Sequence, residues 1–257
     1  MSEKYVRFTT ANNPDPVYGL LSDEAVTPLS GPPWLPYEKT GASVPLAQVS
    51  LKAPVEPSKI VCIGLNYHAH VKASYSADEA PANPLIFLKP SSSIIGPEDE
   101  IVHPVQSERV DYEAELGVVI GKTARAVAEN EAEDYIFGFT CVNDVTARDL
   151  QKKDGQWSRA KGFDTFCPVG PWVVTELNYR DVLVEGILNE KVMQSGRTAQ
   201  MIFNIPFLIS YISSVMTLNP GDLISTGTPS GIAPMKPGDK IEVKVEGIGS
   251  LVNRMAQ

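Results

Sequence analysis

Short apolar runs separated by turn-forming residues dominate the hydrophobic pattern of this chain, and they predict many short β-strands. In residues 241–245, for example, isoleucine and valine alternate with charged residues, which is typical of a half-exposed strand. The expected strands cover residues 5–9, 17–21, 59–64, 85–88, 113–120, 137–142, 171–174, 223–226 and 241–245. They do not alternate regularly with helices, so we expect an α+β, β-rich fold with a rolled, barrel-like mixed sheet rather than a doubly wound parallel sheet.

Three short helices are expected at residues 130–135, 147–153 and 206–216. The last lies in the longest uncharged run, residues 198–221, which is long enough on paper to span a bilayer. Several polar residues and Pro206 interrupt that run, so it is unsuited to a lipid-facing helix. Phe207, Tyr211 and Val215, flanked by Leu208 and Ile212, recur at helical spacing instead, which predicts a buried amphipathic helix and no membrane span.

The first part of the chain differs from the rest in its residue composition. Residues 1–57 are rich in proline and turn residues around two short strand-like pieces, whereas apolar strands follow from residue 58 onwards. This change predicts a small N-terminal β-rich domain at 1–57 and a larger catalytic domain at 58–257.

Composition narrows the class of partner. With 22 basic and 31 acidic residues the net charge is −9, which argues against a nucleic-acid surface but not against an anionic substrate bound by a local cation. No signal-peptide pattern is present, and the three widely spaced cysteines are typical of buried thiols in a reducing compartment, so we expect a cytoplasmic protein. Only three histidines occur, which disfavours a metal site built from several imidazoles.

Two similar turns occur near the C-terminus. Asn219-Pro-Gly-Asp222 and Lys236-Pro-Gly-Asp239 each place Pro-Gly before a strand, which predicts a type II turn in both. We interpret them as two similar turns rather than as a duplication.

The most informative segment for chemistry is residues 110–121, which contains three carboxylates at alternate positions, Asp111, Glu113 and Glu115. On a strand these side chains project to one face, and two parallel carboxylates repel unless a cation or protons lie between them. Asp144, at the end of an expected strand, is the natural third oxygen ligand for a hard divalent ion. The alternative interpretation is a solvated edge strand with ordinary acidic residues.

Six motifs follow one another between about Lys59 and the C-terminus. They are Gly64-Leu-Asn-Tyr-His-Ala-His70, Phe87-Leu-Lys-Pro90, Asp111-Tyr-Glu-Ala-Glu-Leu-Gly117, Asn143-Asp-Val-Thr-Ala-Arg-Asp149, Lys161-Gly-Phe-Asp-Thr-Phe166 and Thr226-Gly-Thr-Pro-Ser-Gly231. In this order they make the chain similar to the fumarylacetoacetate hydrolase family. The resemblance implies a mixed β-roll fold, a homodimer, and a site in which Glu113, Glu115 and Asp144 bind Mg²⁺ or Mn²⁺, with Ca²⁺ also compatible.

The family acts on small anionic 2-oxo acids such as acylpyruvates and oxaloacetate. A 2-oxo acid chelates a divalent cation, which then stabilises an enolate on the keto oxygen as a Lewis acid. C–C bond hydrolysis, decarboxylation and keto–enol exchange all pass through such an enolate. We therefore expect a metal-dependent C–C hydrolase of an acylpyruvate-like substrate. The alternatives are an oxaloacetate decarboxylase or 2-oxo acid tautomerase or isomerase, and a catalytically silent protein that binds small acids.

Four further residues are candidates for contact with the substrate. Lys161 resembles the active-site lysine of the family, and we assign it to the substrate or the developing oxyanion. Arg148 and Gln151 share one face of the helix expected at 147–153, from which both could reach the far end of an acidic substrate. On the pattern alone, a surface role for Arg148 is the alternative. Thr228 lies in a segment of small residues and offers a hydroxyl donor.

His70 matches the general base of the family motif, where a glutamate three residues later orients it and helps to activate water. In this chain that later position is Ala73. An unpartnered histidine remains a base at neutral pH but is less well oriented. The departure therefore weakens water activation specifically and leaves the metal and enolate chemistry in place.

Overall fold

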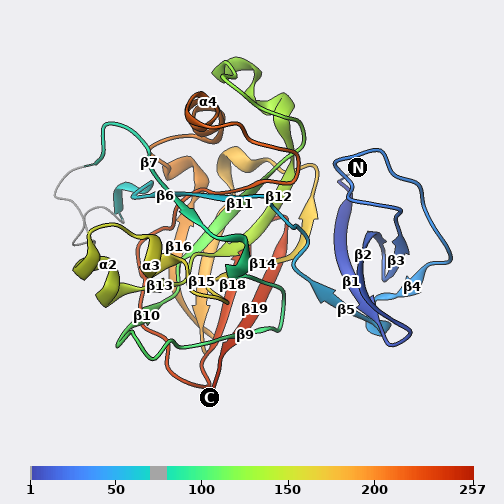
Figure 1. Ribbon diagram of the computed structural model, residues 1–257, viewed down its shortest axis with the longest axis horizontal. Coiled ribbons are helices and arrows are strands. Elements are labelled where there is room, and N and C mark those ends of the chain that lie inside the picture. Colours follow the sequence, from blue (N-terminus) through green and yellow to red (C-terminus); the bar gives the residue numbers. More distant parts are fainter. Residues whose placement is uncertain (1, 70–79) are drawn as a thin grey trace.

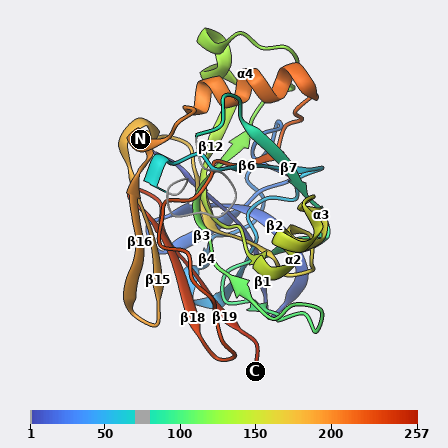
Figure 2. The same cartoon turned by 90° about the vertical axis from the view of Figure 1, so that its left-hand side faces the viewer.

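The structure is a computed structural model that describes residues 2–69 and 80–257. Two sheets and a short two-stranded ladder form the body of the molecule, and short helices lie at its edges (Figures 1 and 2). In the described part of the chain the sheets do not close into a barrel. The expected β-rich α+β roll is confirmed.

The main sheet carries the site on its central strands. Its strand order is β4 (Val44–Pro45), β3 (Ala25–Pro28), β2 (Asn13–Ser22), β1 (Lys4–Thr10), β14 (Cys167–Val174), β12 (Ile136–Asn143), β11 (Ala114–Ile120), β17 (Leu223–Ser225), β6 (Ile60–Gly64) and β7 (Leu85–Lys89). Two further strands join it laterally, β5 (Val49–Lys52) on β1 and β8 (Ile94–Ile95) on β14. Strand β1 pairs with β14, so residues of the expected N-terminal domain extend the main sheet.

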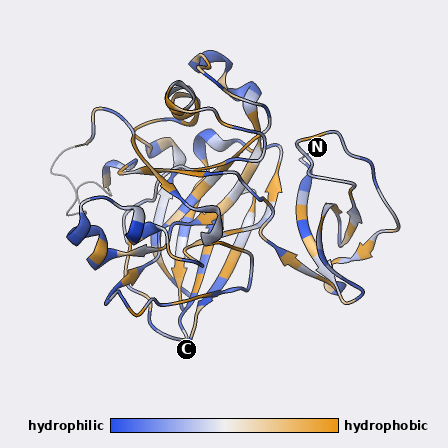
Figure 3. Ribbon diagram, viewed as in Figure 1, coloured by the Kyte–Doolittle hydropathy of each residue, from blue (hydrophilic) through white to orange (hydrophobic). Residues whose placement is uncertain are grey.

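The second sheet packs near the first and has the order β16 (Lys191–Arg197), β15 (Leu183–Leu188), β18 (Lys240–Val245), β19 (Gly249–Met255) and β9 (Glu100–Ile101). A separate ladder joins β10 (Val110–Asp111) to β13 (Thr146–Ala147). The hydrophobic pattern predicted β18 but not the β15–β16 hairpin, because β16 carries no alternation of apolar and polar residues. Orange apolar positions run along the central strands (Figure 3).

Among the described residues, the α-helices with defined bounds are α2 (Arg148–Asp154), α3 (Ser158–Lys161) and α4 (Ile205–Val215). The 3-10 helices with defined bounds there are η1 (Leu46–Gln48), η2 (Ser91–Ser93), η3 (Glu129–Tyr135), η4 (Tyr179–Asp181) and η5 (Thr198–Gln200). The helix expected at 130–135 is therefore a 3-10 helix, whereas those expected at 147–153 and 206–216 are α2 and α4.

Helix α4 confirms the expected buried amphipathic helix, but the apolar positions expected on it differ in burial. Leu208, Ile209 and Ile212 are buried against the main core, whereas Val215 is exposed. Phe207 and Tyr211 stack on each other at the half-buried flank, with ring centroids 6.1 Å apart. Among the residues that the structure describes, no helix combines the length and the apolar character needed to cross a bilayer.

Strand β11 is buried along its whole length because sheet neighbours and core side chains cover both of its faces. Leu116, Val118 and Ile120 enter the largest core cluster on one face, and Val119 enters a second cluster on the other. The same strand carries Glu115, which is 1% exposed. A carboxylate on such a strand has no access to bulk water, and this placement creates the site described next.

Candidate metal centre and active site

Three carboxylates converge at the ends of β11 and β12. Glu113 directly precedes β11, Glu115 lies in it, and Asp144 directly follows β12. Because Ala114 pairs with Asn143 across the two antiparallel strands, the backbone N–H of Asp144 donates to the carbonyl of Glu113 at 2.9 Å. One ligand oxygen from each residue lies within 4.8 Å of the others, and all three side chains are buried. The structure thus brings together the three residues expected to bind a metal.

The surrounding chain fixes the carboxylate of Glu115 and the backbone of Glu113. Glu115 Oε2 accepts from Ser225 Oγ at 2.5 Å and from the backbone N–H of Gly227 at 2.8 Å. The side-chain oxygen of Asn143 accepts from the backbone N–H of Glu113 at 3.0 Å. The Nδ2 of Asn143 is buried beside the triad and has no hydrogen-bond partner in the described part of the chain. A buried donor without a partner costs about 1–3 kcal/mol, which favours a bound oxygen ligand at this position.

Electrostatics at the triad favour a cation. Burial, together with the negative charges of Asp144 and Glu113, raises the pKa of Glu115 to about 8. Three buried carboxylate oxygens are the donor set that a hard divalent ion prefers. The residues therefore fit a divalent cation held by Glu113, Glu115 and Asp144.

Lys161, the last residue of α3, points its ammonium into this cluster. Its Nζ donates to Asp144 Oδ2 at 2.5 Å and to Glu113 Oε2 at 3.0 Å, and it lies 4.9 Å from the centroid of the Phe87 ring. Burial lowers the pKa of Lys161, but Asp144 and Glu113 outweigh it and hold that pKa above its ordinary value. The expected active-site lysine thus lies against two of the three carboxylates.

A second buried lysine was not assigned a role from the sequence. Lys89, the last residue of β7, donates from Nζ to Asp144 Oδ1 at 2.7 Å and to the carbonyl of Val145 at 3.0 Å. The signal for it is a lysine that ends an apolar strand within the Phe87-Leu-Lys-Pro90 motif. Both oxygens of Asp144 are therefore held by ammonium groups.

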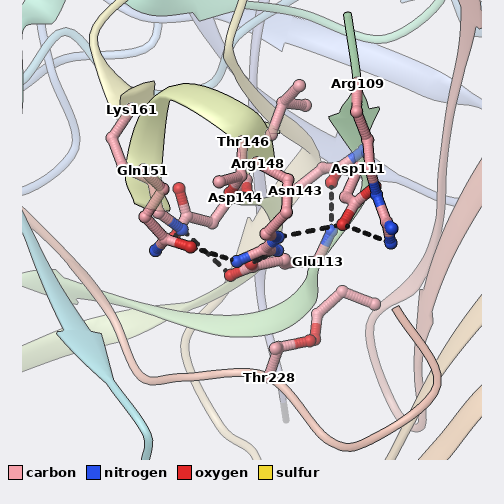
Figure 4. Close-up of polar contacts among 12 residues, drawn as sticks. Arg109, Asp111, Glu113, Asn143, Asp144, Thr146, Arg148, Gln151, Lys161 and Thr228 are labelled. Atoms are coloured by element: carbon pink, nitrogen blue, oxygen red, sulfur yellow. Dashed lines mark hydrogen bonds and ion pairs between the residues drawn. The ribbon is translucent and has the colours of Figure 1, made fainter. Parts of the chain in front are cut away.

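Arg148 and Gln151 extend the site along α2 (Figure 4). The Nη1 of Arg148 donates to Gln151 Oε1 at 2.5 Å, so the expected shared helix face is confirmed. The Nη2 of Arg148 also pairs with Glu113. Burial lowers the pKa of Arg148, but Glu113 and Asp111 outweigh it and raise the net value.

The alternation of Asp111 with Glu113 and Glu115 predicts that the three residues lie on one strand. The structure places Asp111 elsewhere. It lies in β10, which pairs with β13, and the chain changes partner at Tyr112 before β11 begins. Asp111 is fully buried and its Oδ2 accepts from Arg148 Nε at 2.9 Å, while Oδ1 accepts from Arg109 Nε at 2.8 Å. Its position explains how Arg148 is oriented.

Thr228 lies apart from this network in Figure 4. Its hydroxyl donates to the carbonyl of Ala114 at 2.8 Å and accepts from Gln194 Nε2 at 2.8 Å. The Thr228 side chain thus connects the segment after β17 to the start of β11. To donate to a substrate, its hydroxyl would have to give up the hydrogen bond to the carbonyl of Ala114. His70 and Ala73 lie outside the described residues.

Comparisons with known proteins agree with this geometry. The family profile described as "Fumarylacetoacetate (FAA) hydrolase C-terminal" matches residues 59–256, and one described as "Rv2993c-like, N-terminal" matches residues 3–54. The mitochondrial oxaloacetate tautomerase FAHD2A of Homo sapiens is 41% identical over 225 residues, which cover 82% of this chain and 71% of that protein.

Two solved structures extend the likeness to the whole fold. A 2-hydroxyhepta-2,4-diene-1,7-dioate isomerase from Mycobacterium marinum has a TM-score of 0.91 and 41% identity, with 99% of this chain and 98% of that chain covered. The maleylpyruvate hydrolase of Sphingobium sp. SYK-6, solved with manganese(II) and pyruvate, has a TM-score of 0.82 and 31% identity, with 99% of each chain covered.

Proposed function

This chain belongs to the fumarylacetoacetate hydrolase family, and we propose that it is a divalent-metal-dependent enzyme that interconverts the keto and enol forms of a small 2-oxo acid. The observation that carries the proposal is the buried triad of Glu113, Glu115 and Asp144, with the ammonium of Lys161 against it. Buried carboxylates are favourable for binding a cation. A cation beside the ammonium of Lys161 and the guanidinium of Arg148 in turn favours an anionic ligand.

Mg²⁺ or Mn²⁺ held by the triad would supply Lewis-acid stabilisation of negative charge on the keto oxygen of the substrate. Arg148 presents a planar guanidinium for a carboxylate, and Gln151 fixes its orientation through the 2.5 Å hydrogen bond. Lys161 provides an ammonium donor for the oxygen on which charge develops. Lys89 keeps Asp144 in place by its 2.7 Å contact with Oδ1.

The proposed reaction is a proton transfer. A C–H bond on the carbon next to the keto group breaks, the electron pair forms a carbon–carbon double bond, and the keto oxygen gains a proton; the reverse step restores the keto form. The described residues supply donors at the oxygen end. His70, which the family resemblance implies as the base, lies outside them.

Two observations favour proton transfer over the hydrolysis expected first from the sequence. The relatives named as tautomerase and isomerase are 41% identical to this chain, whereas the maleylpyruvate hydrolase is 31% identical. In addition, Ala73 stands where the family pattern has the glutamate that helps to activate water. Hydrolysis of a C–C bond is the second candidate, and the likeness to the maleylpyruvate hydrolase supports it.

The test is a set of steady-state assays with Mg²⁺, in which enol-oxaloacetate, acetylpyruvate and fumarylpyruvate are offered in turn. We expect rapid ketonisation of enol-oxaloacetate without pyruvate release, and a loss of about 10²-fold or more in Lys161→Met. Lys153→Met, an exposed lysine on α2, is the matched control and should retain wild-type rates. Cleavage of acetylpyruvate or fumarylpyruvate without ketonisation would favour hydrolysis, and turnover of none of the three would contradict an enzyme of this class.

A further inference from the structure

A cavity of about 850 Å³ lies beside the metal centre, between β7, α2 and the turn that leads into α3. Its apolar wall is formed by Leu85 and Phe87 of β7 together with Trp157. Its polar wall includes Gln151, Lys152 and Gln156. None of the described residues that line it carries a carboxylate.

Two contacts make this cavity continuous with the site. Gln151 lines the cavity and accepts a hydrogen bond from Arg148, which pairs with Glu113. Phe87 also lines the cavity, and its ring lies 4.9 Å from the Nζ of Lys161, which contacts the same carboxylate. The wall of the cavity is therefore in direct contact with Arg148 and Lys161, the residues proposed to hold the acidic end of a ligand.

Contacts with neighbouring residues hold the aromatic side chains of the apolar wall in fixed positions. The rings of Phe87 and Trp157 meet edge to face with centroids 5.2 Å apart. The Trp157 ring also packs on the backbone of Gly64, so closely that a Cβ at Gly64 would lie 2.7 Å from it. Leu85 on the same strand face is 41% exposed, although burial of its apolar surface would be favourable. These positions fix a rigid aromatic surface beside an incompletely covered apolar one.

We propose that this cavity binds a flat apolar substituent, of the size of a phenyl ring, on the part of the 2-oxo acid that lies away from its carboxylate. The proposal rests on the proposed function, since Arg148 and Lys161 hold the acidic end. The cavity falls in the range of volumes that hold drug-sized ligands, and a four-carbon diacid such as oxaloacetate would leave most of it unfilled. Edge-to-face contact with Phe87 and Trp157 suits an aryl group, as does the absence of carboxylates among the lining residues that the structure describes.

The test compares two acids with the same head group on the Mg²⁺-loaded protein by isothermal titration calorimetry. One is 2-oxo-4-phenylbutanoate and the other is 2-oxobutanoate, which lacks the ring. We expect the phenyl acid to bind at least about tenfold more tightly, because a preformed apolar pocket discriminates even single methylene groups by that factor. Gln156→Trp, which fills the cavity from its polar wall, should reduce this ratio towards one. Lys153→Trp adds the same ring on α2 outside the lining and should leave the ratio unchanged.

Equal affinities of the wild-type protein for the two acids would overturn the inference while conversion of enol-oxaloacetate, and hence the proposed function, still held. Binding of neither acid, together with no conversion of enol-oxaloacetate, would overturn both. A change of molecular mass in solution in Gln156→Trp would identify the cavity as a contact between copies of the chain and would also overturn the inference.

Discussion

Asp144 shows how single residues define this site, because each of its two carboxylate oxygens contacts the ammonium of a different buried lysine. Lys89 contacts Oδ1 at 2.7 Å and Lys161 contacts Oδ2 at 2.5 Å. The two lysines differ in what else they contact: Lys89 donates to a backbone carbonyl, whereas Lys161 donates to Glu113. We infer that Lys89 orients Asp144 and that Lys161 faces the substrate.

Asp111 is the residue through which Arg148 is positioned, and Asp111→Asn tests this role. The substitution removes the negative charge that meets Arg148 Nε at 2.9 Å, so the guanidinium loses one of its two carboxylate partners. We expect kcat/KM for the 2-oxo acid to fall about tenfold, mainly through KM, because Arg148 binds the carboxylate of the substrate. Steady-state kinetics measures the change.

The matched control for Asp111→Asn is Arg109→Gln, which removes the other partner of the same carboxylate. The Arg109 side chain is 46% exposed, so its ion pair contributes little and kinetics should stay near wild type. An unchanged KM in Asp111→Asn, or an equal loss in both variants, would contradict the positioning role.

At the scale of elements, the two Pro-Gly-Asp turns share a sequence but differ in how their aspartates are buried. In both turns, the backbone N–H of the aspartate donates to the backbone carbonyl of the residue three positions earlier, at 3.0 Å. Asp222 is fully buried and accepts from the backbone N–H groups of Ser58, Lys59 and Asn219, and it pairs with the ammonium of Lys59. It thereby joins the starts of the parallel strands β6 and β17. Asp239 accepts from Lys236 and Asn189 at the surface.

Asp222→Ala and Asp239→Ala therefore form a matched pair. Loss of the Asp222 carboxylate leaves several buried donors without a partner, and we expect the free energy of unfolding to fall by ~3–5 kcal/mol. Loss of the Asp239 carboxylate leaves donors that water reaches, so we expect a fall of ~1 kcal/mol. Urea denaturation measures both, and equal losses in the two variants would show that burial does not distinguish the turns.

What the sequence could predict at this scale follows from its local patterns. The alternation of Glu113 with Glu115 and the position of Asp144 after an expected strand made the three carboxylates candidates, and the family resemblance assigned them to a metal. In the structure, the antiparallel pairing of β11 with β12 brings them together. Lys89 and Asp111 required knowledge of distant partners: β7 reaches Asp144 only through the sheet order, and β10 leaves the line of β11 at Tyr112. On α4 the sequence pattern identified the buried Leu208 and Ile212, but it did not show that Val215 is exposed and that Phe207 and Tyr211 are only half-buried.

On the scale of the whole molecule, the strands before residue 54 continue the main sheet through the β1–β14 pair. Aromatic contacts reinforce this junction, since the rings of Tyr5 and Trp34 lie 5.4 Å and 5.8 Å from that of Phe137. Residues before 54 and strands β12 and β14 of the main sheet thus share side-chain contacts as well as hydrogen bonds.

A homodimer is the assembly that the family resemblance implies, and we propose it for this chain. The chain mass is 27.9 kDa, so light scattering coupled to size exclusion should give twice that value for the purified protein. A mass equal to that of one chain, independent of protein concentration, would contradict the proposal.

The central claim is that Glu113, Glu115 and Asp144 together hold a divalent cation where a 2-oxo acid binds. Anomalous diffraction from crystals grown with Mn²⁺ and oxalate, a stable mimic of the 2-oxo acid head, tests it most directly. The account predicts one strong manganese peak within coordination distance of an oxygen from each of the three carboxylates, with oxalate on the same ion and near Arg148 and Lys161. A manganese peak elsewhere, or no peak at the triad, would contradict the account.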